Sequence, residues 1–182
     1  MCIRDSLGIG QGYNSFTILQ LAHATANLAN QGVVMKPHLV KSIENPITKD
    51  RVLTTPQESY KIDLKRENID VITKAMVDVN KFGTSAAVFK GASYNAAGKT
   101  GTAQVYSLNA KTYNHGATPE FLRDHALYVV YAPAENPKIA IAMIVENAGF
   151  GAAHAAPIAR RALDYYLEGR WPKEVPEWKN AP

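Results

Sequence analysis

The chain has 182 residues, of which 46% are hydrophobic and 20% charged, and its formal net charge is +4. This length suits one domain with a sizeable core, and the composition excludes collagen-like, low-complexity and disordered classes. The cations are scattered along the chain, so a slightly basic solvated surface is favoured over a nucleic-acid partner. The single cysteine, Cys2, excludes an internal disulfide and a multi-cysteine metal site. We expect no cofactor.

No apolar stretch reaches the ~20 residues of a membrane span, and the first ten residues lack the apolar region of a signal peptide. A glycine-rich stretch, 8–13, leads into a helix at 17–31, where Thr17 and Gln20 have the spacing of a capping box. Gly32 suits the left-handed residue that ends such a helix. Short strands at 33–35 and 38–43 and an exposed, proline-containing turn or linker are expected next, followed by a helix over 68–81 that Phe82-Gly83 ends.

The second half of the chain predicts an antiparallel sheet. A strand over 92–106 is followed by a polar loop at 107–124, and two β-branched runs at 126–131 and 139–145 form a hairpin. A last helix is expected from Pro157 to residue 168, ended by Gly169. The predicted fold class is therefore α+β, an antiparallel sheet packed by helices 17–31 and 157–168, with helix 69–81 packing elsewhere on the domain.

Gly98-Lys-Thr-Gly-Thr-Ala-Gln104 is the most informative motif, and two classes of site use a Gly-Lys-Thr triplet. A phosphate-binding P-loop needs glycine five positions before Gly98, where this chain has Ser93, and a helix after the triplet, where this chain predicts a strand. The P-loop interpretation therefore fails on both requirements.

The alternative is a strand edge beside a cleft. Thr100 and Thr102, at i and i+2 of a strand, direct both hydroxyls to one side, and Gly101 leaves the backbone open to an extended ligand. Lys99 adds a cation that can hold a carboxylate or tune a hydroxyl, and the Thr102 amide can bind an oxyanion. On this motif alone, an edge strand without a functional role is equally favoured.

Other polar residues give weaker signals. The histidines (His23, His38, His115, His125 and His154) lack metal-site spacing, so surface or packing roles are favoured and no metal site is expected. Glu146-Asn147 either approaches the cleft or caps the end of a strand. Gln11 either borders the cleft or lies in a tight turn before the first helix.

AGKTGTAQV resembles the Lys-Thr-Gly signature of penicillin-binding transpeptidases and their serine β-lactamase relatives. Further segments resemble this family in the family's own order: GIGQGY with the helix after it, AMVDVNKFGTSAAVF, HALYVVYAPAENPKIAIAMIVEN and AAPIARRALDYYL. They are most similar to the class B enzymes of cell elongation, with the division enzymes as an alternative. By this resemblance, 1–7 is a non-family leader and a possible artefact, 8–169 is the C-terminal part of the transpeptidase domain, and 170–182 is a loosely ordered tail.

The resemblance implies an enzyme that cross-links peptidoglycan stem peptides ending in D-alanyl-D-alanine through a serine acyl-enzyme, and that β-lactams target. It makes Lys99 and Thr102 catalytic, Lys99 as a proton-relay and electrostatic residue and the Thr102 amide as half of an oxyanion hole. Thr100, Gly101 and Thr102 would bind substrate, with the two hydroxyls holding its terminal carboxylate, and Gln11 would border the cleft. It also implies a periplasmic domain tethered to the inner membrane, with a membrane glycosyltransferase and a scaffold protein as partners through regions mostly outside this chain.

Two family signatures are missing or displaced. No serine has lysine three positions later, as the nucleophile signature Ser-x-x-Lys requires. Ser93-Tyr94-Asn95 spells the second signature, Ser-x-Asn, but lies six residues before Lys99 on the expected strand, so we reject it. We therefore expect the nucleophile upstream of this chain and expect the fragment alone to be inactive. A non-catalytic scaffold module and a β-lactamase or carboxypeptidase relative are the alternatives.

Overall fold

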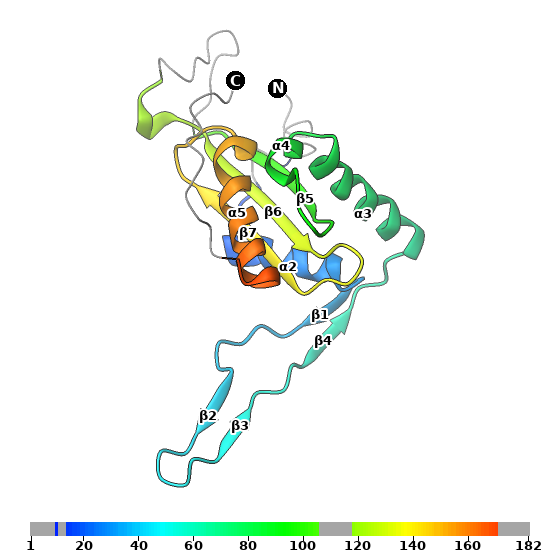
Figure 1. Cartoon of the computed structure of the whole chain (residues 1–182), viewed down its shortest axis with the longest axis vertical. Helices are drawn as coiled ribbons and strands as arrows, with labels where there is room; N and C mark the ends of the chain where they lie inside the picture. Colours follow the sequence, from blue (N-terminus) through cyan, green and yellow to red (C-terminus); the bar gives the residue numbers. More distant parts are fainter. Residues whose placement is uncertain (1–9, 11–13, 106–117, 171–182) are drawn as a thin grey trace.

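The computed structural model describes Gly10 and residues 14–105 and 118–170. Helices and strands follow one another in this order: α2 (Ile18–Ala29), β1 (Val33–Met35), β2 (Ser42–Glu44), β3 (Arg51–Leu53), β4 (Glu58–Lys61), α3 (Arg66–Lys81), α4 (Ala86–Phe89), β5 (Ala97–Ala103), a 3-10 turn (Glu120–Leu122), β6 (His125–Ala132), β7 (Ile139–Val145) and α5 (Gly151–Glu168). Figure 1 shows a body of sheet and helices from which a narrow arm of strands projects. No helix in the described ranges is both long and apolar enough to cross a membrane.

α2 begins at the predicted Thr17 cap, but it ends at Ala29, two residues before the predicted end at residue 31. The Thr17 hydroxyl accepts the Gln20 amide at 3.2 Å, and the Gln20 side chain accepts the Thr17 amide at 2.8 Å, which completes the capping box. Beyond the helix, Gly32 has φ 89°, and a Cβ there would lie 2.5 Å from the carbonyl oxygen of Ile62. Glycine is required at this position both by the left-handed backbone and by the close backbone of Ile62, just after β4.

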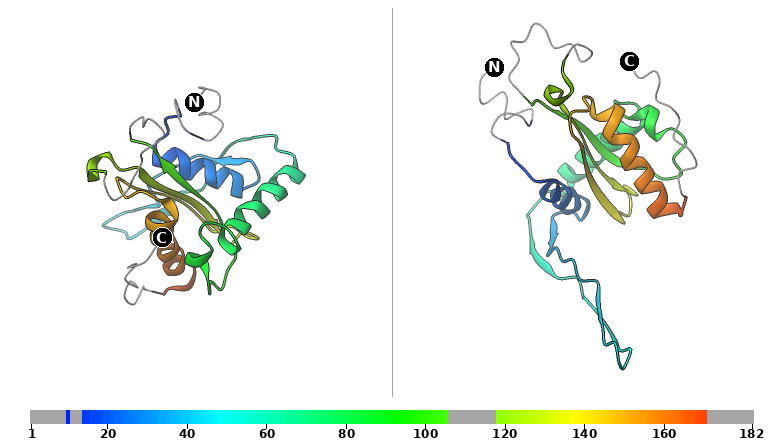
Figure 2. Two further views of the ribbon diagram at one scale, coloured as in Figure 1. Left: turned by 90° about the horizontal axis from the view of Figure 1, so that it is seen from above. Right: turned by 90° about the vertical axis from the view of Figure 1, so that its left-hand side faces the viewer.

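The body contains an antiparallel sheet in the order β5-β6-β7. The predicted hairpin is confirmed, with its paired strands running from His125 to Ala132 and from Ile139 to Val145. α2 and α5 cover opposite faces of this sheet (Figure 2). The predicted α+β architecture, a sheet packed by these two helices, is therefore confirmed.

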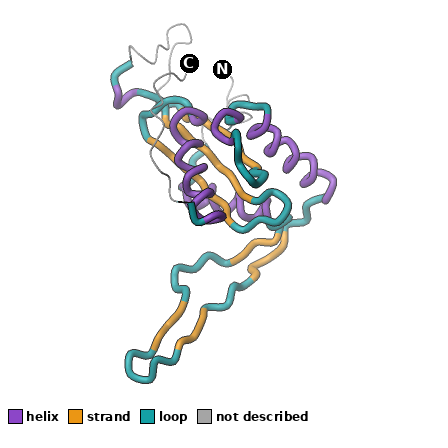
Figure 3. The backbone as a smooth tube through the Cα atoms, viewed as in Figure 1, coloured by secondary structure: helices purple, strands orange, loops and turns teal. Residues whose placement is uncertain are grey.

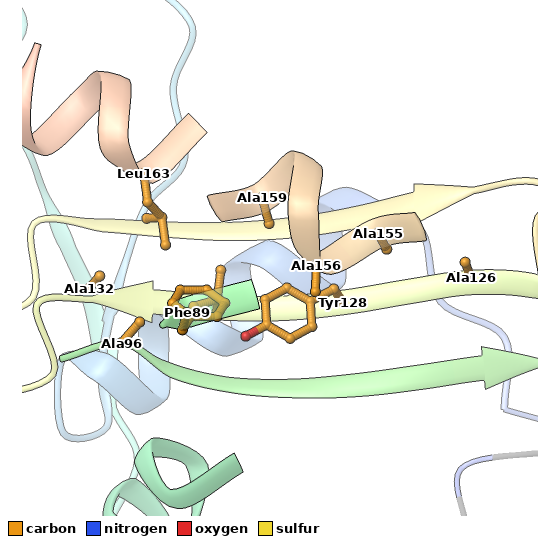
Figure 4. Packing of buried hydrophobic residues seen from close by; sticks show 10 residues of the cluster. Phe89, Ala96, Ala126, Tyr128, Ala132, Ala155, Ala156, Ala159 and Leu163 are labelled. Atoms are coloured by element: carbon orange, nitrogen blue, oxygen red, sulfur yellow. The ribbon is translucent and has the colours of Figure 1, made fainter. Parts of the chain in front are cut away.

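The core lies between the sheet and α5 (Figure 4). Small residues of α5 face a large residue of the sheet in this core. Ala155, Ala156 and Ala159 of α5 are fully buried, and Tyr128 of β6 fills the space opposite them. Phe89 of α4 packs on Tyr128, with ring centroids 6.1 Å apart. The short alanine side chains bring α5 close to the strands, which makes positions in this layer sensitive to added volume.

Two predictions about the body are wrong: the residue at which the last helix begins and the place where α3 packs. The last helix begins at Gly151, six residues before Pro157, because a run of small residues lets its first turns pack onto the sheet despite the proline inside the helix. That packing outweighs the cost of an interior proline, ~3 kcal/mol in an isolated helix. α3 does not pack elsewhere on the domain: it lies along β5. Its side chains also reach β6, where Thr73 hydrogen-bonds the Tyr131 hydroxyl at 2.8 Å.

The segment predicted as short strands and an exposed linker forms the arm (Figure 3). β1 pairs with β4 and β2 pairs with β3, both antiparallel. The strand expected at 38–43 starts only at Ser42, and β3 and β4 were not predicted, because three or four exposed residues carry no alternating apolar pattern. The strand expected at 92–106 is likewise shorter, since β5 covers Ala97–Ala103. The four-residue helix α4 was missed as well.

Some predictions fall on parts of the chain outside the described residues. These are the leader at 1–7, the tail beyond Arg170 and most of the polar loop at 107–124. The division of the chain into leader, domain and tail therefore stays a prediction. At the end of α5, the left-handed Gly169 that the sequence predicted is confirmed, with φ 65°.

Ionisation of buried tyrosines should destabilise the body at high pH. Burial raises the pKa of Tyr128 to about 12 and also raises the pKa of Tyr94 and of Tyr131. A raised folded-state pKa adds stability that is complete below the unfolded pKa of ~10 and is lost as pH rises through the folded pKa. We expect the free energy of unfolding, measured by denaturant titration, to fall between about pH 10 and 12. Tyr128→Phe should flatten this fall, whereas Tyr60→Phe, at an exposed position, should not; equal slopes in both variants would contradict this prediction.

Candidate active-site strand

β5 carries the Gly98–Thr102 motif along an edge of the sheet. Thr100 lies opposite Tyr128 in the register, and Thr102 lies opposite Ala126. Directly opposed residues share a face of a sheet, so both threonines lie on the face that α5 covers, as their i, i+2 spacing predicted. The extended conformation also confirms that no phosphate-binding helix follows the Gly-Lys-Thr triplet.

Lys99 lies on the other face of β5, opposite Val129. Its side chain is exposed, and its Nζ donates a hydrogen bond to the carbonyl oxygen of Thr100 at 2.7 Å. The ammonium group therefore lies against the backbone of its own strand. An anionic ligand can take the place of this neutral carbonyl because its negative charge adds Coulombic attraction to the ammonium.

A buried hydrogen-bond network lies beneath the motif. A Cβ on Gly98 would lie 2.2 Å from the Tyr128 hydroxyl oxygen, so this hydroxyl fills the space of the missing side chain. The hydroxyl points toward β5 in Figure 4 and donates to Asn80 Oδ1 at 2.6 Å. Ser85 Oγ donates to the same oxygen at 2.6 Å, and Asn80 Nδ2 donates to the Ala96 carbonyl at 2.8 Å. The network joins the end of α3 to β5 and β6.

Thr84 contacts the motif directly. It lies in the turn between α3 and α4, and its Oγ1 is 3.0 Å from Oγ1 of Thr100. This turn belongs to a segment that carries the family resemblance, AMVDVNKFGTSAAVF, but the resemblance assigned Thr84 no role. Its contact spans 16 positions of the chain, so no local spacing rule could have found it.

α5 begins directly against the motif. A Cβ on Gly151 would lie 2.4 Å from the carbonyl oxygen of Gly101 and 2.2 Å from that of Leu127. Both atoms belong to the backbone of paired strands, so neither can move aside alone. Gly151 was missed because the sequence placed the start of this helix at Pro157.

The rejected Ser93-Tyr94-Asn95 motif lies before β5, away from Thr102, and its side chains bind structural partners. Tyr94 donates to Asp164 of α5 at 2.6 Å. Ser93 Oγ donates to Glu168, and Asn95 Nδ2 donates to Glu135. These hydrogen bonds connect the segment before β5 to the C-terminal part of α5 and to the turn between β6 and β7.

The weaker candidates have structural contacts where they are described. His23 hydrogen-bonds the Met35 carbonyl at 2.9 Å, and His125 Nδ1 accepts the Asn147 amide at 2.9 Å. Asn147 Nδ2 also donates to the carbonyl of Arg123, just before β6, at 3.0 Å. Within 14–105 and 118–170, no group of three His, Cys, Asp or Glu side chains could hold a metal ion. Gln11 lies outside the described residues, and its place at the cleft stays a prediction.

Two hollows among the described residues lie away from the motif side chains of β5. Two hollows of ≈ 580 and ≈ 430 Å³ lie beside α3, the first against α4 and residues 92–96, the second against α2 and the turn between β6 and β7. Lys99, Thr100 and Thr102 line neither of them. Within the described residues, neither of these two hollows therefore encloses the motif side chains of β5.

Known proteins match this chain over most of its length. The sequence profile described as "Penicillin binding protein transpeptidase domain" matches residues 4–164. Peptidoglycan D,D-transpeptidase MrdA of Haemophilus influenzae is 43% identical over 176 residues, 92% of this chain and 26% of the relative. MrdA of Escherichia coli K12 is 38% identical over 166 residues, 90% of this chain and 26% of the relative. The chain therefore spans about a quarter of the length of these curated relatives.

Solved structures agree with these relatives. Penicillin-binding protein 2 of Pseudomonas aeruginosa, in complex with WCK 5153, matches with a TM-score of 0.71 and 37% identity over 96% of this chain and 36% of that chain. Penicillin-binding protein A of Mycobacterium tuberculosis, as a ceftriaxone acyl-enzyme complex, matches with a TM-score of 0.73 and 30% identity over 90% of this chain and 35% of that chain. The predicted resemblance to the class B elongation enzymes, represented by penicillin-binding protein 2, is confirmed. The chain belongs to the penicillin-binding protein transpeptidase domain family.

Proposed function

We propose that this chain forms one wall of the active site of a peptidoglycan D,D-transpeptidase, whose substrate is a stem peptide ending in D-alanyl-D-alanine. The observation that carries the proposal is β5: an edge strand with an exposed lysine on one face and two threonines on the other. The names of the curated relatives support the reaction, and the acyl-enzyme complex of the Mycobacterium tuberculosis neighbour supports its covalent intermediate.

The substrate docks along β5 as an added strand, because an edge strand offers backbone groups to an extended peptide. The hydroxyls of Thr100 and Thr102 donate hydrogen bonds to its terminal carboxylate. The Thr102 amide donates to the oxyanion that forms on the penultimate carbonyl. Lys99 places a positive charge beside the reacting serine and helps to relay its proton.

The reaction has two halves. The serine oxygen bonds to the penultimate carbonyl carbon, the carbon–nitrogen bond to the terminal D-alanine breaks, and the serine proton passes to the leaving amine. An amine of a neighbouring stem peptide then attacks the ester, forms the new amide and returns a proton to the serine oxygen. β-Lactams acylate the same serine, but their leaving amine stays tethered to the acyl group.

The serine itself comes from outside this chain. None of the 182 residues is a serine with lysine three positions later, and the chain spans about a quarter of its relatives. The chain alone is therefore inactive, and the Ser-x-x-Lys and Ser-x-Asn signatures face β5 from the rest of the enzyme. The enzyme works on the periplasmic side of the inner membrane, where peptidoglycan is cross-linked. A membrane glycosyltransferase and a scaffold protein are its partners, and nucleic acid is not.

Replacing both Thr100 and Thr102 by valine tests this site in the full-length enzyme. Valine keeps the shape and strand propensity of threonine but removes the two hydroxyl donors. We expect ligand capture to weaken by ~1–3 kcal/mol for each lost charge-assisted bond, with little change in folding. The measurement is the second-order rate constant of acylation by a fluorescent penicillin, with the melting temperature recorded for each variant.

Two comparisons make this test specific. Thr102→Val alone should keep the oxyanion hole, because the proposed donor there is a backbone amide. Thr55→Val makes the same chemical change at an exposed position in the arm and should acylate at the wild-type rate. A wild-type rate in the double variant, with its melting temperature unchanged, would show that β5 is only scaffold.

A further inference from the structure

We propose that Thr84 is a positioning residue for carboxylate recognition: its hydroxyl orients the hydroxyl of Thr100. This inference rests on the proposed function of Thr100. Its direct basis is the distance of 3.0 Å between the two Oγ1 atoms, which places them in hydrogen-bond contact. Thr84 is exposed and Thr100 is half-buried, so the pair lies at the surface of the sheet edge, where a ligand can reach it.

The turn that carries Thr84 is fixed on both sides. Before it, the Gly83 amide donates to the Asp78 carbonyl at 3.0 Å, and a Cβ on Gly83 would lie 2.8 Å from Cα of Val79. After it, Ser85 is fully buried and donates to Oδ1 of Asn80 at 2.6 Å. The Thr84 backbone therefore has little freedom, and its hydroxyl is held where it meets β5.

The same network fixes the other member of the pair. Asn80 holds the Ala96 carbonyl just before β5 at 2.8 Å and accepts the Tyr128 hydroxyl at 2.6 Å. Tyr128 lies opposite Thr100 in the register. One buried asparagine thus sets the positions of both the turn and the strand, so the separation of the two threonine hydroxyls is set by buried contacts rather than by two independent surface segments.

The direction of the hydrogen bond between Thr84 and Thr100 explains why this contact matters for carboxylate binding. An ionised carboxylate only accepts hydrogen bonds, so Thr100 must use its single proton as donor toward the ligand. Its bond with Thr84 then requires that Thr84 be the donor and the Thr100 oxygen the acceptor. This arrangement selects the productive rotamer of the Thr100 hydroxyl and polarises it, which strengthens its own bond to the carboxylate.

The test is a double-mutant cycle in the full-length enzyme with Thr84→Val, Thr100→Val and the combined variant. Acylation by benzylpenicillin and by its methyl ester is followed by intact-protein mass spectrometry, with melting temperatures as the check on folding. We expect Thr84→Val to slow acylation by benzylpenicillin about 3- to 10-fold, the usual size of one neutral hydrogen bond in a cooperative pair. The ester lacks the charged acceptor, so its rate should change less than about twofold.

Three further results are expected if Thr84 acts through Thr100. In the Thr100→Val background, adding Thr84→Val should change the rate less than about twofold, because the group that it orients is gone. Thr84→Ser keeps the hydroxyl and should stay within about twofold of wild type, whereas Thr84→Ala should repeat the loss seen with valine. Thr55→Val, the exposed control in the arm, should leave both substrates unaffected.

The contrary outcomes separate this inference from the proposed function. A slow Thr100→Val variant beside a wild-type rate in both Thr84→Val and Thr84→Ala would overturn the role of Thr84 and leave the role of β5 standing. Equal losses with penicillin and its ester, or losses that multiply in the combined variant, would likewise reduce Thr84 to a structural contact. A wild-type rate in Thr100→Val would overturn the carboxylate-binding role of Thr100 and, with it, the role of Thr84.

Discussion

Replacing Lys99 by alanine in the full-length enzyme should lower the second-order rate of penicillin acylation by about 100-fold or more. The exposed ammonium donates a hydrogen bond to the Thr100 carbonyl of its own strand, so its removal costs the fold little. In the proposed site its loss costs the reaction much more, because Lys99 is the one cation of β5 and the proposal places its charge beside the reacting serine, where it stabilises the transition state. The measurement is acylation by a fluorescent penicillin, with melting temperature alongside.

The controls for this experiment come from the same chain. Lys138→Ala removes an exposed lysine in the turn between β6 and β7 and should acylate at the wild-type rate. The 182 residues expressed alone should form no adduct, since no serine with the nucleophile spacing is present in them. A wild-type rate in Lys99→Ala, or a penicillin adduct on the chain alone, would refute the corresponding assignment.

Gly151→Ala should destabilise the domain by about 2 kcal/mol or more and should also slow acylation. The added Cβ would lie 2.2 Å from the Leu127 carbonyl oxygen, 2.4 Å from that of Gly101 and 3.1 Å from the Gly101 amide nitrogen. Each of these is a backbone atom of β5 or β6, so either α5 must move away from the sheet or the motif strand must shift. Both responses disturb the position of the Thr100–Thr102 edge.

Gly101→Ala is the matched control for stability. It adds the same methyl group to the same contact region, but the added Cβ would meet only the Leu127 Cβ, at 3.3 Å, which a small displacement relieves. Thermal and denaturant unfolding of the two variants should therefore differ, with the larger loss in Gly151→Ala. Equal stabilities would mean that the start of α5 has room that the structure does not show.

Local signals in the sequence determined the elements whose cause lies within a few residues. The capping box of α2 needs only Thr17 and Gln20, and the left-handed end of α5 needs only Gly169. The β6–β7 hairpin follows from two β-branched runs and the proline-rich turn that joins them. The Lys-Thr-Gly motif was placed on a strand by the residues around it, and its threonines share a face because side chains alternate along a strand.

The tertiary structure alone decided the features that depend on residues far apart in the chain. The early start of α5 depends on the close packing of its small residues against the sheet, which outweighs the local preference of Pro157 for the first turn. The pairing of β1 with β4 joins a predicted strand, in which Val34 is buried, to an exposed segment with no apolar pattern of its own. The contact of Thr84 with Thr100 exists only once α3 lies along β5, and the Tyr128 hydroxyl fills the space at Gly98 only once β5 pairs with β6. Sequence spacing encodes which face a residue takes within its own element, whereas contacts between elements arise from packing volume and buried hydrogen bonds, which no single segment contains.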